Sequence, residues 1–433
     1  MFFSLSVTVS TGWYVLGIIA LVLLAAYFLA GLFGPMPRYQ IEGEHEIPAN
    51  DSNAFLLLLG SLVDAVINRT GKLEVFTNGP DFYPAILDAF RSAQHSVNLE
   101  AYVFQKSEIA RRYVEVLAER ARAGVQVNLV LDAFGSLGAP DSVFRPLREA
   151  GGKVKRYNRL TWYALMRMDN RTHRELVIVD GKVAFIGGAG VADQWFTGVK
   201  GKPRWRDTMI RVEGEAVPNL QATFAENWLQ ASGELLAGKA YFPEIDCPDP
   251  TTALVINSTP TVGGSTRARI LMQLLVASAR HSISITTPYF LPDHSLTRAL
   301  CDAVERGLKV RILVPGAKSD HMLTRSTSRG GYGALLKAGA EVFEYQPSMI
   351  HAKILIVDEL WAVVGSTNFD NRSFGINDEV NLAVRDRAVA SRLAADTAAD
   401  LRQSQRVTLD DWRHRPVTER ATELLGWVIE RQQ

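Results

Sequence analysis

Two stretches of the chain begin with a histidine and continue in the same pattern. One reads HAKILIVDELWAVVGSTN from His351, and the other reads HRELVIVDGKVAFIGGAG from His173. Alternate side chains of a strand share a face, so His351 and Lys353 would lie together, as would His173 and Glu175. An imidazole beside an ammonium group suits a phosphodiester, because one group can attack or protonate while the other offsets the phosphate charge.

A turn follows each of these strands. In the first copy Asp180 precedes Gly181, and this dipeptide is typical of a tight hairpin. In the second copy Asp358 would face away from His351 on a regular strand, so we predict a role in the turn or in an ion pair. The returning strand would bring Asn368 back towards His351, which adds an amide to the site.

Other landmarks of the chain repeat in the same order. The stretch AQHSVNLEAYVF from Ala93 matches ARHSISITTPYF from Ala279. Helical stretches such as 109–123 and 295–306 alternate with the predicted strands, which is typical of an α/β fold. The sequence therefore predicts two duplicated α/β halves, and the proline-containing stretch 233–266 is the expected connector between them.

The composition indicates a folded chain without an overall charge. Hydrophobic residues make up 47% of the 433 positions, which is enough for a substantial core. The 47 basic and 46 acidic residues nearly cancel, so no basic field favours nucleic acid as a partner. The two cysteines, Cys247 and Cys301, form no disulfide framework or zinc pattern and fit a reducing compartment.

The N-terminal region is apolar. No charged residue occurs from Trp13 to Phe33, and as a helix this stretch would be about 31 Å long, close to the thickness of a hydrocarbon core. We interpret it as one transmembrane anchor rather than a secretory signal, because no Lys or Arg precedes it and no A-x-A site follows its core. Arg38, the nearest basic residue, favours a cytoplasmic catalytic region.

The second copy of the histidine motif resembles the HxKx4Dx6GSxxN signature of the phospholipase D superfamily. The matching residues are His351, Lys353, Asp358, Gly365, Ser366 and Asn368. Stretches such as GPDFYPAILDAF and NFDNRSFGINDEVNL are more specifically similar to bacterial cardiolipin synthases. The resemblance implies two phospholipase D-like halves with mixed sheets flanked by helices, which bring both histidine motifs into one site. We expect an anchor over 1–38, a first half over 39–240, and a second half with a C-terminal helix over 241–433.

The resemblance also implies an activity. A membrane-anchored phosphatidyltransferase of the bacterial inner membrane would transfer a phosphatidyl group from phosphatidylglycerol to a lipid hydroxyl, giving cardiolipin. The reaction would pass through a phosphohistidine and would need no metal or cofactor. His173 would be the nucleophile and His351 the acid, and Lys353, Ser366 and Asn368 would contact the substrate.

Two acidic residues stand at matching places after the two motifs. They are Asp207 in WRDTMIRV and Glu379 in NDEVNLAV. A histidine in this chemistry needs an acceptor on its second nitrogen, which fixes the tautomer and stabilises the cation. The resemblance implies this orienting role for both carboxylates.

The first copy departs from the signature at two positions. Glu175 stands in place of Lys and Gly190 in place of Asn. A carboxylate near a phosphate is repulsive unless it is paired or protonated. We expect Glu175 to contact the substrate region after neutralisation by a cation such as Lys353 or Arg206. The alternative is a catalytically impaired first half.

Two other functions stay open on the sequence alone. One is a phospholipase D-type phosphodiesterase that hydrolyses phospholipids, and the other is a lipid-binding scaffold without turnover. A nuclease is disfavoured, because a balanced charge and a bilayer anchor provide little for a polyanion. The sequence does not specify the oligomeric state.

Overall fold

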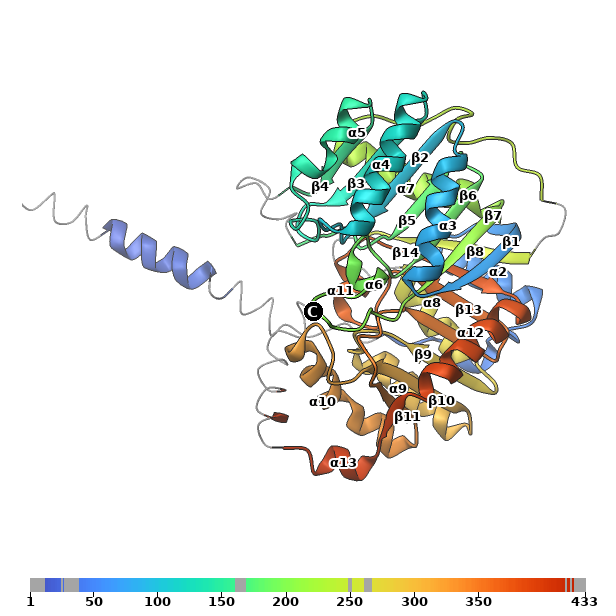
Figure 1. Ribbon diagram of the computed structural model, residues 1–433. Coiled ribbons are helices and arrows are strands. Elements are labelled where there is room, and N and C mark those ends of the chain that lie inside the picture. Colours follow the sequence, from blue (N-terminus) through green and yellow to red (C-terminus); the bar gives the residue numbers. More distant parts are fainter. Residues whose placement is uncertain are drawn as a thin grey trace, which may run out of the picture.

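The computed structural model describes residues 12–24, 26, 39–159, 169–247, 251–260, 267–416, 419, 420 and 423. Within them a 15-stranded mixed sheet runs through the folded body (Figure 1). The first half of the chain contributes β1 (Ile67–Thr77), β2 (Ser96–Ala101), β3 (Gln126–Asp132), β4 (Lys153–Tyr157), β5 (Leu176–Val179), β6 (Val183–Gly187) and β7 (Thr208–Gly214). The second half contributes β8 (Thr251–Ser258), β9 (Ser282–Thr286), β10 (Lys309–Pro315), β11 (Glu341–Tyr345), β12 (Ile354–Val357), β13 (Trp361–Gly365), β14 (Glu379–Arg385) and β15 (Ser404–Val407).

Helices connect and cover these strands. Those before and within the first half are η1 (Glu44–Glu46), α2 (Asn53–Leu62), α3 (Gly79–Ser92), α4 (Glu108–Arg122), η2 (Asp141–Phe144), α5 (Arg145–Glu149), α6 (Asp193–Phe196) and α7 (Ala216–Ser232). Those of the second half are α8 (Arg267–Ser278), α9 (His294–Glu305), α10 (Met322–Ala338), α11 (Asn371–Gly375), α12 (Arg387–Leu401) and α13 (Leu409–Arg413). The helices predicted at 109–123 and 295–306 are therefore confirmed as α4 and α9. Side chains at their N-caps, Ser107 and Asp293, accept backbone N–H groups of the first turn.

The strand order repeats on the two sides of the sheet. From the centre outward it is β1-β7-β6-β5-β2-β3-β4 in the first half and β8-β14-β13-β12-β9-β10-β11-β15 in the second. The halves join where β1 pairs antiparallel with β8, with Ile67 opposite Leu254. Strands β2, β3 and β4 are parallel, whereas β5, β6 and β7 are antiparallel. The predicted α/β fold of two duplicated halves with a mixed sheet is confirmed.

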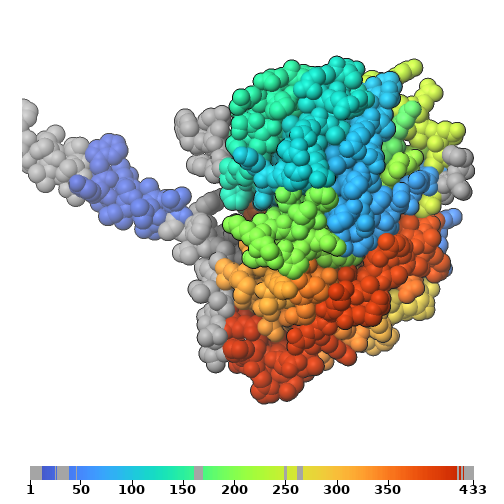
Figure 2. Space-filling model, viewed as in Figure 1, coloured from blue at the N-terminus to red at the C-terminus, as the bar shows by residue number. Residues whose placement is uncertain are grey.

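Two long helices hold the halves together. Helix α7 and β8, which belongs to the other half, contribute to one buried cluster that includes Leu220, Phe224 and Val255. Helix α12 packs in the same cluster, and its neighbours there include Val75 of β1. Figure 2 shows the two halves in contact along a broad seam, the first in blue to green and the second in yellow to red. The two halves therefore share a core and fold as one unit.

Two segments depart from the predicted organisation. Helix α2 precedes every strand of the first half, yet Phe55 and Leu59 pack in the core of the second half with Leu271. Asn50, just before this helix, donates to Asp358 at 2.6 Å. The predicted connector 233–266 contains β8, because the run of consecutive apolar residues at 253–256 forms part of a central strand of the sheet.

The predicted anchor is described only in part. Residues 12–24 form a helix with exposed apolar side chains, such as Trp13 at 71% and Leu24 at 68% exposure, and Figure 1 shows it apart from the folded body. Within the described ranges, no helix is both long and apolar enough to cross a membrane. The rest of the predicted Trp13 to Phe33 anchor and nearly all of the predicted C-terminal helix lie outside the described residues.

Candidate active site

Both histidine motifs reach one cavity of about 650 Å³. Each motif forms the predicted hairpin, since β5 pairs antiparallel with β6 and β12 with β13. His173 and His351 stand shortly before β5 and β12 and line the cavity, together with Glu175 and Asn368. Its aromatic lining residues are Tyr102, Phe134, Trp195, Trp205 and Tyr289. The cavity has the volume of a site for a lipid headgroup or a similar ligand.

Each histidine is held by a carboxylate of the other half. His173 Nδ1 lies 3.1 Å from Oε1 of Glu379, and His351 Nδ1 lies 2.9 Å from Oδ2 of Asp207. Both carboxylates are fully buried. In each pair Nδ1–H donates and the imidazole keeps Nε2 for chemistry, so the two halves complete each other's site.

Backbone bridges between the halves produce this exchange. The N–H of His173 donates to the carbonyl of Asp378 at 2.9 Å, next to Glu379. The N–H of His351 donates to the carbonyl of Arg206 at 2.7 Å, next to Asp207. The segment before each motif strand therefore pairs with the segment that carries the acid of the opposite half.

Lys353 lies over the ring of His351. Its Nζ is 2.9 Å from Nδ1 and 3.1 Å from Nε2 of the imidazole, and it donates to the His351 carbonyl at 2.8 Å. Burial lowers the pKa of both side chains, and the Lys353 charge lowers the pKa of His351 further. The lysine ammonium is thus buried against the imidazole and the carbonyl of His351.

Asp207 is the centre of a buried network. Its Oδ2 also accepts from the Trp195 indole at 2.9 Å, and its Oδ1 accepts from the Thr208 N–H at 2.8 Å. Burial by itself raises the pKa of Asp207, but the hydrogen bond from His351 and the nearby positive charge hold it below its ordinary value. Asp207 is therefore positioned as a carboxylate acceptor for the imidazole of His351.

Ser366 and Asn368 have different positions, although both were predicted to contact substrate. The Ser366 hydroxyl is fully buried and donates to Oε2 of Glu379, so it supports the carboxylate that holds His173. Asn368 lines the cavity, and within the described residues its buried Oδ1 has no hydrogen-bond partner. Of the two, Asn368 is the residue that a ligand in the cavity can reach.

The two motif aspartates have matching structural positions. Asp180 accepts the backbone N–H groups of Gln94, His95 and Ser96 at 2.7 to 2.9 Å. Asp358 accepts those of Arg280, His281 and Ser282 over the same distances. Both aspartates have a positive φ, 53° and 54°, which suits the tight turn of the hairpin. They fix the turn to the start of the neighbouring strand and lie away from the cavity.

Glu175 is not paired with the cations that the sequence suggested. Among the described residues it forms no ion pair, and Arg206 pairs instead with Asp400 at 2.9 Å. Its Oε1 accepts the backbone N–H groups of Tyr102 at 3.1 Å and Val103 at 3.3 Å. Burial raises the pKa of Glu175 well above its ordinary value. The carboxyl is therefore held by backbone donors just after β2 rather than by a cation.

Several lining residues were not found by sequence reasoning. Trp195 and Trp205 pack against the His351 ring at centroid distances of 5.3 and 5.4 Å, and Tyr102 packs against His173 at 5.3 Å. Burial raises the pKa of Asp370, which also lines the cavity, to about 6. Trp205 stands two residues before Asp207 in the sequence, and this proximity could have indicated that it lines the cavity. In the described part of the chain, no group of His, Cys, Asp or Glu residues could hold a metal ion.

Comparison with known proteins agrees with this geometry. The family described as "Cardiolipin synthase, PLD-like domain" matches residues 86–228 and 272–401, one match in each half. The chain belongs to this family. It is 33% identical over 360 residues to a probable cardiolipin synthase of Bacillus subtilis, YwiE, covering 82% of this chain and 71% of that protein. It is 32% identical over 358 residues to cardiolipin synthase 1 of Bacillus anthracis, covering 81% and 70%.

A solved structure shares the fold of this cardiolipin synthase family member. The phosphatidylserine synthase of Haemophilus influenzae superposes with a TM-score of 0.64, covering 85% of this chain and 98% of that one. The two sequences are only 13% identical, so this likeness concerns the arrangement of the two halves.

Proposed function

We propose that this member of the cardiolipin synthase family is a phosphatidyltransferase that converts two phosphatidylglycerol molecules into cardiolipin and glycerol. The observation that carries the proposal is the pair of histidines on one cavity, each held through Nδ1 by a buried carboxylate of the opposite half. Nucleophile and acid on one phosphate are the minimum for a double displacement. The names of the relatives supply the substrate class.

In the first step Nε2 of His173 attacks phosphorus, and the bond from phosphorus to the glycerol oxygen breaks. No hydrogen bond within the described residues occupies this Nε2, whereas both ring nitrogens of His351 contact Lys353, which supports His173 as the nucleophile. His351, as imidazolium on Asp207, gives its Nε2 proton to the leaving glycerol oxygen. Glycerol then departs and a phosphatidyl-histidine remains.

In the second step the hydroxyl of another phosphatidylglycerol takes the place of glycerol. His351 accepts its proton, the oxygen attacks phosphorus, and the bond from phosphorus to His173 breaks. Lys353 and Asn368 bind the phosphate oxygens in both steps. The aromatic residues at the cavity reduce access of water, which would otherwise yield phosphatidic acid.

The location of the enzyme follows from its substrate and its N-terminus. The proposal includes a single anchor from Trp13 to Phe33, supported by the uncharged sequence and the exposed apolar helix 12–24. The protein would lie in the bacterial inner membrane with its catalytic halves on the cytoplasmic side.

Its partners are phospholipids and not nucleic acid. We keep the division 1–38, 39–240 and 241–433, with the exception that α2 packs on the second half.

Purified full-length protein in mixed micelles of phosphatidylglycerol tests the function. Mass spectrometry should find cardiolipin and glycerol in equal amounts, and neither product with His173→Ala or His351→Ala. Phosphatidic acid without cardiolipin would identify a hydrolase. Lipid binding without any product would identify a scaffold. Either result would refute the transferase.

A further inference from the structure

The first half of the site differs from the second half in a coordinated way. Phe104 and Phe290 form equivalent isolated bridges to Val191 and Phe369, and each of these two partners stands 18 residues after the histidine of its half. By this equivalence Tyr102 corresponds to Pro288, a residue with no backbone N–H. Tyr102 is one of the two donors to Glu175. The second half has Lys353 at this motif position. The first half has Glu175 instead, together with a backbone N–H at Tyr102 that donates to its carboxyl group.

Gly190 belongs to the same arrangement. A Cβ at this position would lie 2.5 Å from the Val103 carbonyl oxygen and 3.1 Å from Oε1 of Glu175. The Tyr83 hydroxyl donates to the Gly190 carbonyl at 2.6 Å. The end of β2 and Glu175 therefore occupy the space that an asparagine would need, which explains why the two departures from the signature occur together.

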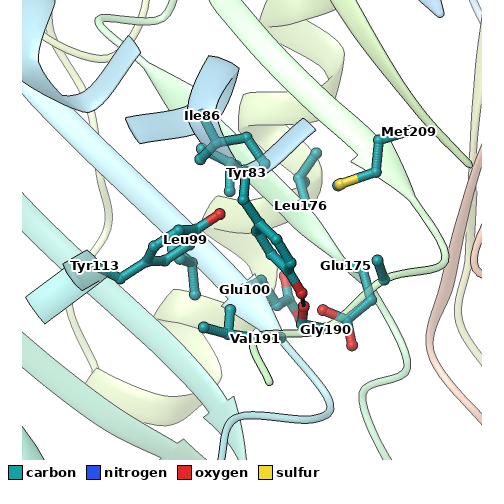
Figure 3. A pocket seen from close by; sticks show the side chains of 13 residues that line it. Tyr83, Ile86, Leu99, Glu100, Tyr113, Glu175, Leu176, Gly190, Val191 and Met209 are labelled. Carbon is teal, nitrogen blue, oxygen red and sulfur yellow. Dashed lines mark hydrogen bonds between the residues drawn. The ribbon is translucent and has the colours of Figure 1, made fainter. Parts of the chain in front are cut away.

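The surroundings of Glu175 disfavour a negative charge. The residue is 6% exposed and lines a second, small cavity of about 10 Å³ among apolar side chains such as Leu99 and Met209 (Figure 3). Glu100 lines the same small cavity, and burial raises its pKa to about 7. The titratable groups that act on Glu175 or face it include Tyr83 of α3, Tyr102, Tyr113 of α4, Glu100 of β2, Asp207, Lys353, His173 and His351.

The second carboxyl oxygen is available to a ligand. Glu175 lines the large cavity as well as the small one, and within the described residues its Oε2 makes no hydrogen bond. We propose that Glu175 is an uncharged carboxyl group that donates one hydrogen bond from Oε2 to a phosphate oxygen, where the second half supplies the Lys353 ammonium. The inference rests on the proposed phosphoryl transfer in this cavity.

The consequence concerns the charge of the ligand. A site with one ammonium and one neutral donor suits a phosphodiester, which has one negative charge. A site with two ammonium groups would favour a phosphomonoester, which is mostly doubly charged at pH 7. Glu175 therefore selects the phosphodiester of phosphatidylglycerol over the phosphomonoester of phosphatidic acid.

Calorimetric titration of the full-length protein with dimethyl phosphate and with methyl phosphate at pH 7 tests the selection. Wild type should prefer dimethyl phosphate, and Glu175→Gln should keep this preference within about threefold, because the amide can accept at Oε1 and donate from Nε2. Glu175→Ala should bind dimethyl phosphate about tenfold more weakly, and Glu175→Lys should shift the preference towards methyl phosphate by about tenfold or more.

A tenfold shift towards methyl phosphate in Glu175→Gln would overturn the proposal, because it would mean that wild type carries a carboxylate. The glutamine variant decides this even if the lysine variant does not fold. Absence of binding of both ligands to wild type would also overturn it. The titration needs no turnover, and cardiolipin formation by the same preparation tests the transferase separately. Binding without transfer would contradict only the proposed function.

Discussion

Replacing Asp207 by asparagine tests the exchange of carboxylates between the halves. Its two oxygens accept three buried donors, His351 Nδ1–H, Trp195 Nε1–H and Thr208 N–H. An asparagine has one oxygen, so its NH₂ group must face at least one of these donors. The unsatisfied contact should cost about 1 to 3 kcal/mol of stability. If NH₂ faces His351, the imidazole takes the other tautomer, and Nε2 can no longer accept a proton.

The rate of cardiolipin formation should therefore fall by about 10³- to 10⁴-fold, the size of effect seen when a histidine loses its orienting carboxylate. Asp358→Asn is the matched control, because Asp358 also accepts three backbone N–H donors but lies away from the cavity. It should lose stability by a similar amount and retain activity below its melting temperature. A rate for Asp207→Asn within tenfold of wild type would refute the orienting role, as would an equal loss of rate in Asp358→Asn.

Three other predictions follow from the site and the N-terminus. Lys353→Met should lower kcat/KM by about 10²- to 10³-fold and raise the pKa of His351, which NMR titration can measure; an unchanged pKa would contradict the contact. The raised pKa of Glu175 means that wild type loses stability relative to Glu175→Gln as pH rises above the ordinary carboxyl value, by up to about 1.4 kcal/mol per pH unit until the folded-state pKa is passed. Denaturant titrations in which the difference in unfolding free energy between wild type and Glu175→Gln stays constant from pH 4 to 8 would contradict this pH dependence. A protein that begins at residue 39 should keep its thermal transition but no longer sediment with membranes; undiminished sedimentation would argue against the anchor.

Much of the candidate site could be predicted from the alternation of side chains along each strand. Alternation alone put Glu175 on the side of His173, and the structure places both on the cavity. Arg174, which the same alternation turns away from His173 and Glu175, contacts Glu226 and Asn257. Asp180 and Asp358 end their strands in turns, as expected from the residues that follow them. These features are local, so a single stretch of sequence specifies them.

Features that depend on packing between the halves could not be read from the sequence. Matching positions after the motifs indicated an orienting carboxylate for each histidine but not which carboxylate holds which histidine. The bridges at Thr172 and Ile350 pair each motif with the carboxylate of the other half. The hydrogen-bond donors to Glu175 were not predicted, because they are backbone N–H groups and the sequence pattern indicates only the types of side chains. The contrast between Tyr102 and Pro288 was the signal that could have revealed it. The packing of helix α2 on the second half also depends on contacts between the halves. Its apolar side chains could pack on either half, so its own sequence does not specify which one.

The covalent intermediate tests the central claim most directly. Wild type incubated with phosphatidylglycerol labelled at phosphorus, then denatured in alkali and digested, should yield a labelled peptide that contains His173. The label should disappear when an excess of unlabelled phosphatidylglycerol is added before denaturation, and His173→Ala should yield none. Continued cardiolipin formation with no labelled histidine, or a label on His351 alone, would contradict the mechanism in which His173 attacks and His351 protonates.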